Sequence, residues 1–445
     1  MTQGFDLKDK VIKYFTEFEN SLNGFAKDVN GDTTKIQSIR IDAIKRFEKI
    51  GFPEFKTEEW KYTNIRPITG KDFTLAPETS ALTSENVKKF IIPGLKANIL
   101  VFINGKYSEK FSKIISKDKD VFIGSLKSGL TWHKDIIEKH FSKYAAYNKD
   151  GFTALNTAYS IDGAFIYVPK GIVVTEPVHL IFISDNYSSD VLSQPRNLII
   201  CSESSELNIL ETYHSLNSNY SFTNVVTEIY SGQNSRIEHY KIQDENDKSF
   251  NVNTTQVRQE KDSYYNSLTI TWGGSIVRNN LNSVLSGKNG ECHFLGLYLS
   301  KNNELFDNHT LVDHAVPNCF SNELYKGILD DNSSGVFNGK IMVRKDAQKT
   351  NAYQSNKNII LSKKASVNSK PQLEIFADDV KCSHGATTGQ LNPEELFYLM
   401  SRGIGRKEAG NMLLIAFAND VIENIKIEPL KEMLFDTLVK KLMRD

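Results

Sequence analysis

SGQNSRIEHYKI at residues 231–242 is followed by a near repeat, SGKNGECHFLGL, at residues 286–297. Both stretches join a Ser-Gly turn and an Asn to a short run suited to a β-strand. A looser echo, DDNSSGVFNGKIMV, begins at Asp330. Repetition of turn plus strand is typical of solenoids, in which each unit packs against its neighbours. The pattern therefore favours stacked turns of a β-solenoid.

The segment around these repeats, from about residue 160 to 385, is a series of short strand patterns divided by Asn, Ser, Gly and Asp clusters. We expect no helix of a dozen residues in it, and we interpret Gly273-Gly274 as a turn or bulge. A sandwich or jelly roll stays as the alternative, because the period of the repeat is not sharp. Upstream, alternation from Asn98 to Phe111 predicts the first strands, with a hairpin turn at Asn104-Gly105.

The N-terminal part shows helical spacing, which predicts a helix that stops at Gly51. The apolar positions that carry this spacing are Ile39, Ala43, Ile44 and Phe47. The next segment, FPEFKTEEWKYT (52–63), contains Trp60 and Tyr62, which we expect to act as aromatic anchors on a neighbouring part of the fold. The sequence therefore predicts a small helical region before the strands.

The C-terminal part returns to helix. In LNPEELFYLMSRGI (391–404), Asn392 and Pro393 form a helix start, Glu395 completes a capping box, and Gly403 is a stop signal. Two further helices are expected in RKEAGNMLLIAFANDVIENI (406–425) and EPLKEMLFDTLVKKLM (428–443). We divide the chain into a helical N-terminal region (1–95), a β core (96–385) with a helical interruption near 134–160, and a helical C-terminal region (386–445).

Composition excludes several classes of function. Lysine plus arginine and aspartate plus glutamate balance at 54 each, which argues against a partner that is nucleic acid or an anionic membrane. The first residues carry no pattern of a signal peptide or transmembrane segment. The sequence contains no GxxxxGK[ST], GxGxxG, GxSxG or HExxH motif, so it does not resemble a self-contained ATPase or hydrolase.

The four cysteines are far apart and form no CxxC pair, which indicates free thiols in a reducing, cytoplasmic compartment. They are Cys201, Cys292, Cys319 and Cys382.

Cys382 and His384 lie in the stretch KPQLEIFADDVKCSHGATT (370–388). Residues two apart on a strand point to the same side, so a thiol and an imidazole are presented together. Metals that accept sulfur and nitrogen normally take about four ligands, and nothing beside this pair supplies the others. Either the remaining ligands come from elsewhere, or the pair is structural.

A second group of ligand-type residues lies in NHTLVDHAVPNCFSNELYKG (308–327), where His309, His314 and Cys319 are five apart. An odd spacing puts neighbours on opposite faces of a strand, so the three converge only if the strand bends. We interpret them as structural residues, hydrogen-bonded or packed in the turns.

Four stretches together resemble the SufB/SufD family of the SUF iron–sulfur cluster assembly system. They are YQSNKNIILSKKASVNSKPQLEIFADDVKCSHGATTGQLNPEELFYLMSRGI (353–404), FPEFKTEEWKYT (52–63), FTALNTAYSIDGAFIYVPKG (152–171) and the stretch 308–327. The combination of FPxxKxExWKYT with CSHGAT favours the SufD branch over SufB.

The resemblance implies a mainly β protein with a right-handed parallel β-helix core between helical ends. It also implies a scaffold subunit that is not itself an enzyme, pairs with SufB and docks the ATPase SufC through its C-terminal helices. Within those helices we take Leu413 and Phe417 as candidate contacts for the partner. A homodimer of the SufD type, and a solitary β-helix that binds or cleaves polysaccharide, are the alternatives.

The resemblance also implies a role for the Cys382/His384 pair. In the family, the histidine that corresponds to His384 lies at the SufB–SufD interface opposite a SufB cysteine, with the residue that corresponds to Cys382 beside it. The implied cofactor is a transient iron–sulfur cluster shared with SufB, and ATP enters only through SufC. A reduced flavin has been associated with the family and stays an open alternative.

Overall fold

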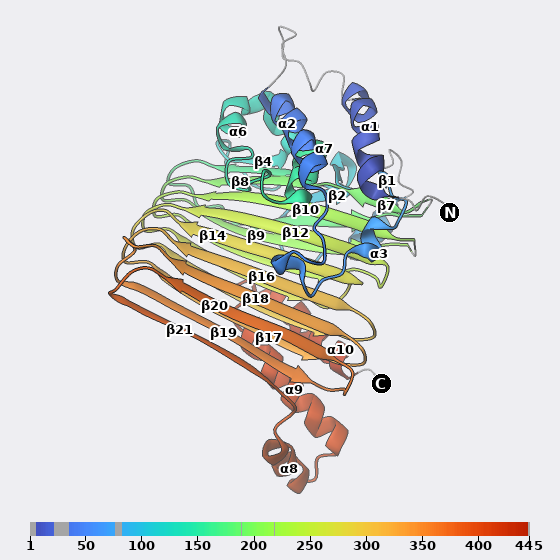
Figure 1. The fold of residues 1–445 in the computed structure, drawn as a ribbon, viewed down its shortest axis with the longest axis vertical. Coiled ribbons are helices and arrows are strands. Elements are labelled where there is room, and N and C mark those ends of the chain that lie inside the picture. Colours follow the sequence, from blue (N-terminus) through green and yellow to red (C-terminus); the bar gives the residue numbers. More distant parts are fainter. Residues whose placement is uncertain (1–5, 22–34, 76–81, 188, 218, 444–445) are drawn as a thin grey trace.

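The computed structural model describes residues 6–21, 35–75, 82–187, 189–217 and 219–443, and every structural statement below refers to these residues. Its core is a flattened solenoid whose successive strands alternate between two sheets (Figure 1). One turn of the solenoid takes about 30 residues, within the range of solenoid repeats.

The first sheet, sheet 1, begins at the C-terminal end of the stack with β20 and runs to β4. Its strands are β20 (Ser366–Ile375), β18 (Ser334–Val343), β16 (Leu305–His314), β14 (Ile276–Leu285), β12 (Ser249–Gln259), β10 (Ser221–Ser231), β8 (Arg196–Cys201), β5 (Ala164–Val168) and β4 (Phe122–Ser125), with β7 (Val191–Ser193) beside β10 and β1 (Thr74–Leu75) beside β7.

The second sheet, sheet 2, begins with β21 and runs to β3. Its strands are β21 (Val380–Gly389), β19 (Thr350–Ile360), β17 (Phe320–Leu329), β15 (Glu291–Ser300), β13 (Tyr264–Thr271), β11 (Arg236–Asp244), β9 (Glu206–Ser215), β6 (Val178–Ser184), β2 (Asn98–Ile103) and β3 (Lys106–Tyr107).

Neighbouring strands are parallel except for the pairs β2–β3 and β4–β5. Parallel pairing of every second strand confirms the predicted β-helix core between helical ends. The sandwich and the jelly roll are excluded, because those folds are built from antiparallel strands. The predicted hairpin at Asn104-Gly105 is the β2–β3 turn, in which both residues have positive φ, of 49° and 80°.

One corner of the solenoid is made by a series of residues in the left-handed backbone conformation. They are Ser204, Asn234, Asp262, Asn289, Asn318 and Lys349. The turns they form are stacked by hydrogen bonds, for example from the Asn234 N–H to the Lys261 carbonyl at 2.9 Å. Asn and Asp tolerate this conformation better than most residues. Asn234 and Asn289 are the matching residues of the two repeats, so the repeat encodes this corner.

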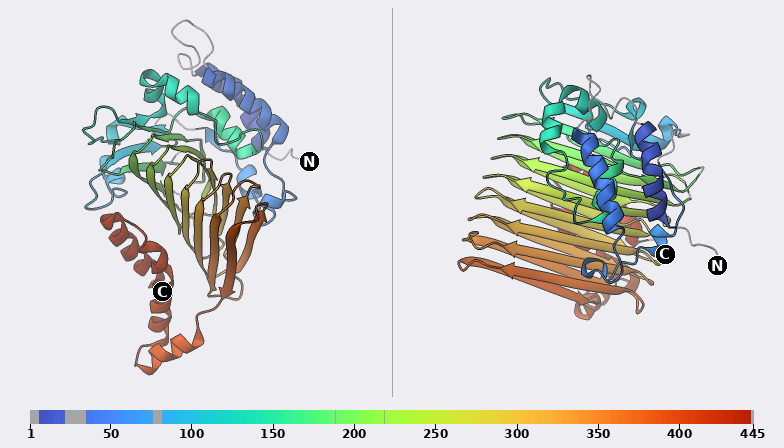
Figure 2. Two further views of the ribbon diagram at one scale, coloured as in Figure 1. Left: turned by 90° about the vertical axis from the view of Figure 1, so that its left-hand side faces the viewer. Right: turned by 45° about the horizontal axis from the view of Figure 1, so that its top comes forward.

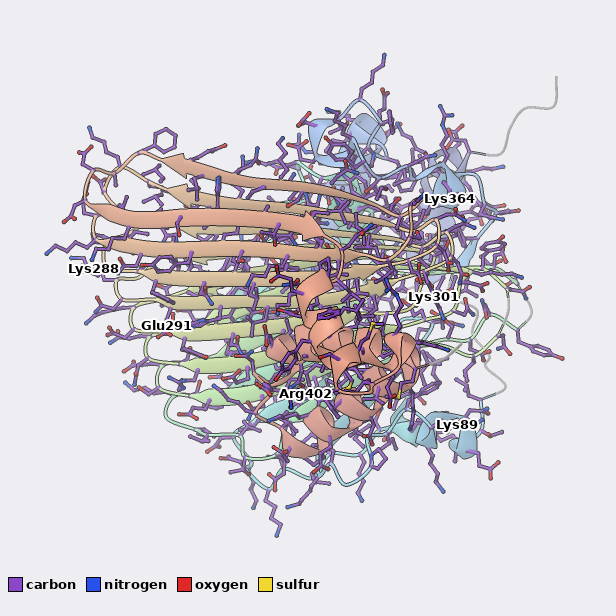
Figure 3. The ribbon with its side chains drawn as sticks, turned by 90° about the horizontal axis from the view of Figure 1, so that it is seen from below. Lys89, Lys288, Glu291, Lys301, Lys364 and Arg402 are labelled. Carbon is purple, nitrogen blue, oxygen red and sulfur yellow. The ribbon has the colours of Figure 1, made fainter. Side chains whose placement is uncertain are left out.

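The looser echo belongs to the opposite corner, where Asp331 has φ of 52° and the chain enters β18 of sheet 1. Figure 3 shows the two corners, with Lys288 at one and Lys301 at the other. The echo is therefore a similar turn in a different sheet, which explains why the period read from the sequence was irregular.

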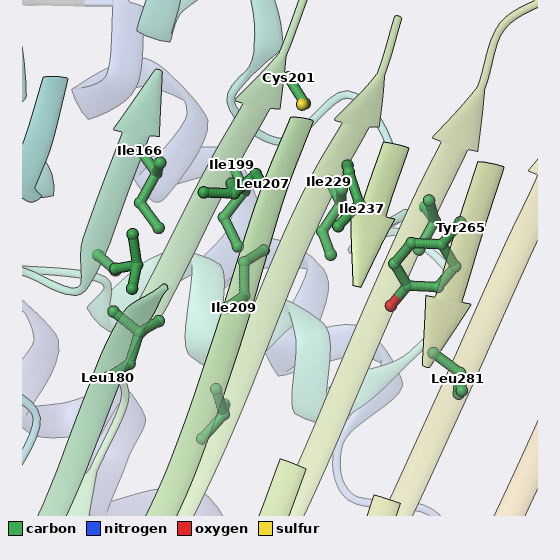
Figure 4. Packing of buried hydrophobic residues seen from close by; sticks show 14 of the residues in the cluster. Ile166, Leu180, Ile199, Cys201, Leu207, Ile209, Ile229, Ile237, Tyr265 and Leu281 are labelled. Carbon is green, nitrogen blue, oxygen red and sulfur yellow. The ribbon is translucent and has the colours of Figure 1, made fainter. Parts of the chain in front are cut away.

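The space between the sheets is filled by apolar side chains from both (Figure 4). Ile199 and Ile229 come from sheet 1, and Ile209 comes from sheet 2; all three are fully buried. Burying one such side chain contributes about 1.5–3 kcal/mol relative to leaving it in water. The stack of turns therefore has a continuous core of its own.

Helices gather towards the N-terminal end of the stack, most of them on the outer face of sheet 1 (Figures 1 and 2). They are α1 (Leu7–Ser21), α2 (Lys35–Ile50), α3 (Arg66–Thr69), α4 (Ser84–Lys88), α5 (Leu126–Trp132), α6 (Lys134–His140) and α7 (Gly151–Tyr159), with the 3₁₀ turn η2 (Glu109–Phe111). The 3₁₀ turn η1 (Glu58–Trp60) lies further along the same face, where Glu58 pairs with Lys370 of β20. The helical interruption expected near 134–160 corresponds to α6 and α7, and α5 precedes it. Every residue of α7 is buried, and the Asp150 carboxylate accepts the Thr153 N–H at its start. Residues 1–5, 22–34 and 76–81 of the predicted N-terminal region lie outside the described residues.

Trp60 is the anchor that the sequence predicted. Its ring packs against Phe152 at a centroid distance of 5.0 Å and against the guanidinium of Arg278, on β14, at 3.8 Å. Tyr62 leaves 41% of its surface exposed, so it contributes much less to this contact. Gly51, with φ of 69°, ends α2 as expected.

The C-terminal helices are α8 (Pro393–Ser401), α9 (Arg406–Ile422) and α10 (Glu428–Leu442). The Asn392 side chain accepts the Glu394 N–H, which confirms the predicted N-cap of α8. Helices α9 and α10 pack on the outer face of sheet 2, with Leu430, Leu434 and Leu438 fully buried. Helix α8 has no buried residue and stands away from the sheets (Figure 2).

Three ion pairs fasten α9 and α10 along the outer face of sheet 2. Lys326 of β17 binds Asp420 of α9. Lys426, between the helices, binds Glu238 of β11, and Lys441 of α10 binds Asp244 at 3.0 Å. The two helices therefore run along the stack from β17 back to β11. No helix in the described part of the chain is long and apolar enough to cross a membrane.

Candidate functional site

The C-terminal end of the solenoid is open. β20 pairs only with β18, and β21 pairs only with β19, so one edge of each strand has no neighbour within the described residues. We call this end face the mouth and define it by the inward-facing residues of the two strands. They are Val367, Ser369, Pro371, Leu373 and Ile375 of β20, and Cys382, His384, Ala386 and Thr388 of β21.

Cys382 and His384 face into the mouth. They are in register with Ala352 and Gln354 of β19, both buried between the sheets, and side chains in register on parallel strands lie on the same face. The sequence-based expectation of one shared side therefore holds. Their surroundings differ: Cys382 packs against an apolar cluster that includes Val343 and Ala352, whereas His384 is exposed. Burial raises the pKa of the Cys382 thiol.

The pair does not form a closed metal site by itself. The described residues contain no group of three or more His, Cys, Asp or Glu side chains that could hold a metal ion. A site at the mouth therefore needs ligands from outside the described chain, since a borderline metal takes about four. What the arrangement can do alone is present one sulfur and one nitrogen at an open edge.

His309, His314 and Cys319 do not converge, which confirms their structural interpretation. His309 is on the outer face of β16, with Nε2 2.9 Å from Asp307 Oδ1. His314 is buried and 2.9 Å from the Ser321 hydroxyl, and burial lowers its pKa to about 3, so it is neutral. The Cys319 thiol donates to the Gly287 carbonyl in a turn.

The interior also contains a charged cluster that the sequence reasoning missed. Glu211 of β9 lies 3.2 Å from His239 Nε2 and 3.8 Å from Lys241 Nζ, and it accepts a hydrogen bond from the Tyr213 hydroxyl at 2.9 Å. Although burial opposes ionisation, Lys241 and His239 lower the pKa of Glu211 to about 2. The group is enclosed by the sheets and its charges are paired with one another, so we interpret it as structural.

Closer to the mouth, two buried polar side chains lack hydrogen-bond partners for some of their atoms. Glu323 of β17 is 1% exposed; Oε2 accepts from the Thr310 hydroxyl at 2.5 Å, and Oε1 has no hydrogen-bond partner. Burial raises the pKa of Glu323 to about 7. Gln354 is buried too, and neither atom of its amide has a partner. The signal in the sequence was a polar residue at an inward position of SNELYKG, visible only once the register of the strands is known.

The candidate partner contacts on α9 are partly used within the chain. Leu413 and Phe417 are half-buried. Lys326 Nζ lies 4.4 Å from the Phe417 ring and donates to its carbonyl at 2.9 Å. The exposed apolar side chains nearby were not singled out from sequence. They are Phe397, Tyr398 and Met400 of α8 and Met412 of α9.

Comparison with known proteins matches nearly the whole chain to two family profiles. "SufBD protein N-terminal region" matches residues 7–180, and "SUF system FeS cluster assembly, SufBD core domain" matches residues 182–417. The chain belongs to the SufBD family of the SUF iron–sulfur cluster assembly system. The SufBD core match includes β20, β21 and hence the whole mouth.

Relatives that cover most of the chain support the SufBD assignment. An iron–sulfur cluster assembly SufBD family protein of Synechocystis is 32% identical over 390 residues, which are 85% of each chain. The iron–sulfur cluster assembly protein SufD of Escherichia coli is 30% identical over 410 residues, 90% of this chain and 91% of the relative. SufD of Bacillus subtilis is 26% identical over 421 residues, 92% of this chain and 94% of the relative.

Proposed function

We propose that the protein is a scaffold subunit of the SUF assembly complex, without catalytic activity of its own, and that its mouth pairs with SufB. In this proposal His384, supported by Cys382, supplies part of a cluster-building site that both chains share. The observation that carries it is the position of these two side chains at an end face whose strand edges have no neighbour within the described residues.

The two free edges favour pairing with another chain. An edge strand offers a row of backbone N–H and C=O groups, and a second sheet can continue the ladder there. Pro371 lacks an N–H, so β20 has fewer donors than β21, which contains no proline. Ile375 and Phe376 are exposed at the rim and would be buried by a partner. We therefore place the main backbone pairing along β21.

The proposed division of labour follows the three parts of the chain. The N-terminal region (1–95) supports the core, the core (96–385) carries most of the strands, and the C-terminal region (386–445) docks SufC. The exposed apolar residues Phe397, Tyr398 and Met400 on α8 support docking there, because exposed aromatic clusters mark interaction surfaces. Leu413 and Phe417 stay in the proposal as flanking contacts.

The chemistry at the mouth is transient ligation of iron and sulfur, which are cargo in this scheme. Neutral imidazole binds iron and releases it when protonated, so His384 suits temporary holding. ATP enters only through SufC, and use of a reduced flavin is left as part of the proposal. The four cysteines form no disulfide, which supports a cytoplasmic location.

A solitary polysaccharide-binding β-helix is not supported by the outer face of sheet 1. A groove of about 920 Å³ lies there, between five strands and the segment from Ile50 to Trp60. Its floor is formed by amides and lysines, including Asn282 and Lys340, and Trp60 is only 6% exposed. Among the described residues, the strands that line this groove therefore supply no row of exposed aromatic rings for stacking on sugars.

Replacement of His384 tests the proposal. We expect His384→Ala to reduce the yield of cluster on the complex reconstituted with SufB and SufC by about tenfold or more, as loss of a metal ligand does. Ser383→Ala, an exposed change on the opposite face of β21, is the matched control. Size-exclusion chromatography should find both complexes intact. Normal cluster formation by His384→Ala in an intact complex would remove the site and leave the scaffold; binding of a second copy in place of SufB would favour the homodimer.

A further inference from the structure

Gln354 is the least satisfied buried side chain near the mouth. It is 3% exposed, and both Nε2 and Oε1 lack a hydrogen-bond partner. Leaving a buried amide unpaired is unfavourable, because the group has lost its hydration without gaining an equivalent bond. Such a group in a folded protein calls for a specific explanation.

Gln354 occupies the middle of a three-residue column. Glu323 of β17, Gln354 of β19 and His384 of β21 are register partners on successive strands. Strands in a sheet are about 4.8 Å apart, so side chains one step along the column can touch. All three face inward, since their neighbours Tyr325 and Asn356, two positions along, are buried as well.

The residues at both ends of this column, Glu323 and His384, also have atoms that are free to form a hydrogen bond with Gln354. Glu323 Oε1 has no hydrogen-bond partner, and the Gln354 amide is near enough to oppose in part the effect of burial on the Glu323 pKa. The His384 ring makes no hydrogen bond with any described residue and is exposed at the mouth. Gly339 of β18 leaves the space for the amide, because a Cβ at this position would overlap Gln354 Nε2.

We propose that Gln354 is a positioning residue for His384. Its amide oxygen accepts the N–H of one ring nitrogen of His384, while its amide nitrogen donates to Glu323 Oε1. The other ring nitrogen then carries the lone pair and points out of the mouth. No proton changes place and no bond to the cargo is required for this contact.

Glutamine fits this position better than the alternatives. A primary amide donates and accepts at the same time, so it can bridge a carboxylate and an imidazole N–H, whereas a carboxylate could only accept when ionised. Histidines that bind metals usually donate their second N–H to a carbonyl or carboxylate, which fixes both the tautomer and the direction of the ring. The inference rests on the proposed function only for what the outward nitrogen binds.

The test measures the tautomer of His384 directly, in the free full-length chain. The protein is labelled with ¹⁵N-histidine, and its imidazole resonances are recorded at a pH where the rings are neutral. The variant His384→Asn identifies the His384 signal among the nine histidines. Gln354→Met keeps the length of the side chain and removes both hydrogen-bonding groups. Gln372→Met, on the opposite face of β20, is the matched control.

We expect one tautomer of His384 to dominate in the wild type, and the ratio to change by about two- to tenfold in Gln354→Met, as one net hydrogen bond allows. Gln372→Met should leave the ratio unchanged. An unchanged ratio in a folded Gln354→Met variant overturns the inference. Should that variant not fold, Gln354→Asn keeps an amide but shortens it by one methylene and tests the same contact with the same readout.

Cluster assembly separates this inference from the proposed function. If Gln354→Met lowers the cluster yield and His384→Ala lowers it by about tenfold or more, both are supported. If the tautomer ratio changes but His384→Ala assembles clusters normally, the contact stands and the proposed site falls. A yield that depends on His384 together with an unchanged tautomer ratio overturns the role of Gln354 alone.

Discussion

The two ends of the solenoid are built in opposite ways (Figures 1 and 2). At the N-terminal end, α2 and α7 pack together so closely that a Cβ at Gly151 would overlap the Gly51 carbonyl, and antiparallel strands close both sheets. At the C-terminal end, β20 and β21 each have one edge without a neighbouring strand among the described residues. A capping element normally shields the ends of a repeat protein from association. The difference is the one that the proposed function requires, because it leaves the C-terminal end free to pair with another chain.

The same difference continues inside the stack. Glu211, near the middle, is surrounded by Lys241, His239 and Tyr213, which hold it ionised. Glu323, closer to the mouth, has one unpartnered oxygen and no cation beside it. The buried carboxylate in the middle of the stack is therefore paired with charged and hydrogen-bonding residues of this chain, whereas the one next to the mouth keeps an oxygen without a partner.

The largest effect is expected at the closed end. Phe152→Ala should lower the free energy of unfolding by about 3–5 kcal/mol, because the ring is 1% exposed and packs against Phe52, Trp60 and Phe222. Ile375→Ala, at the rim of the mouth, should change it by less than about 1 kcal/mol. Urea unfolding followed by circular dichroism measures both. Equal losses at the two positions would contradict the comparison of the two ends.

The second effect concerns pH. Burial raises the pKa of Glu323 to about 7, above the value of about 4.3 in an unfolded chain. Between these two pH values the folded state binds more protons than the unfolded state does. The contribution of Glu323 to the free energy of unfolding is therefore complete at low pH and is lost as the pH rises towards 7. We expect the free energy of unfolding of Glu323→Gln to exceed that of the wild type by about 2 kcal/mol at pH 8 and by little at pH 5.

Urea titrations of both proteins at the two pH values measure this difference, and other titrating groups cancel in the comparison. Glu211→Gln serves as the opposite case: its carboxylate has a lowered pKa, so the variant should be less stable than the wild type at pH 8. If the free energies of unfolding of Glu323→Gln and the wild type changed with pH in the same way, the prediction would be wrong. The carboxylate of Glu323 would then be stabilised in the folded state as well as it is in water.

The smallest effect is a change in affinity at the mouth. Ala386→Lys puts a charge on the inward face of β21, where a partner would bury it, so we expect the dissociation constant for SufB to rise by about tenfold or more. Ser383→Lys, on the outward face of the same strand, should leave it nearly unchanged. Isothermal titration calorimetry compares them. A similar loss from both changes would place the partner on the outer face of the sheet.

Much of the fold followed from local signals in the sequence. Turns were predicted at Asn234, at Asn289 and at Asn104-Gly105, because few residue types adopt the left-handed backbone conformation that these turns require. Asn392 announced a helix because its side chain satisfies a backbone N–H next to it. Each of these needs only a few neighbouring residues, so a single sequence suffices to predict it.

The parts that escaped prediction depend on contacts between distant residues. Gln354 and Glu323 come together only through the register of strands that are about 30 residues apart in sequence. The face of α9 that meets the sheet could not be identified either, since apolar residues surround that helix, and Phe417 proved to lie partly against Lys326. The Cys382/His384 pair was visible because both residues lie on one strand.

The ion pairs that fasten α9 and α10 to sheet 2 couple the length of these helices to the length of the solenoid. Lys326, Glu238 and Asp244 fix the attachment points on β17 and β11, while β21 fixes where the helices begin. Inserting one more turn between those points would lengthen the stack by about 4.8 Å, which a helix spans with about three residues. The number of turns between β11 and β17 can therefore change only if α9 and α10 change length with it.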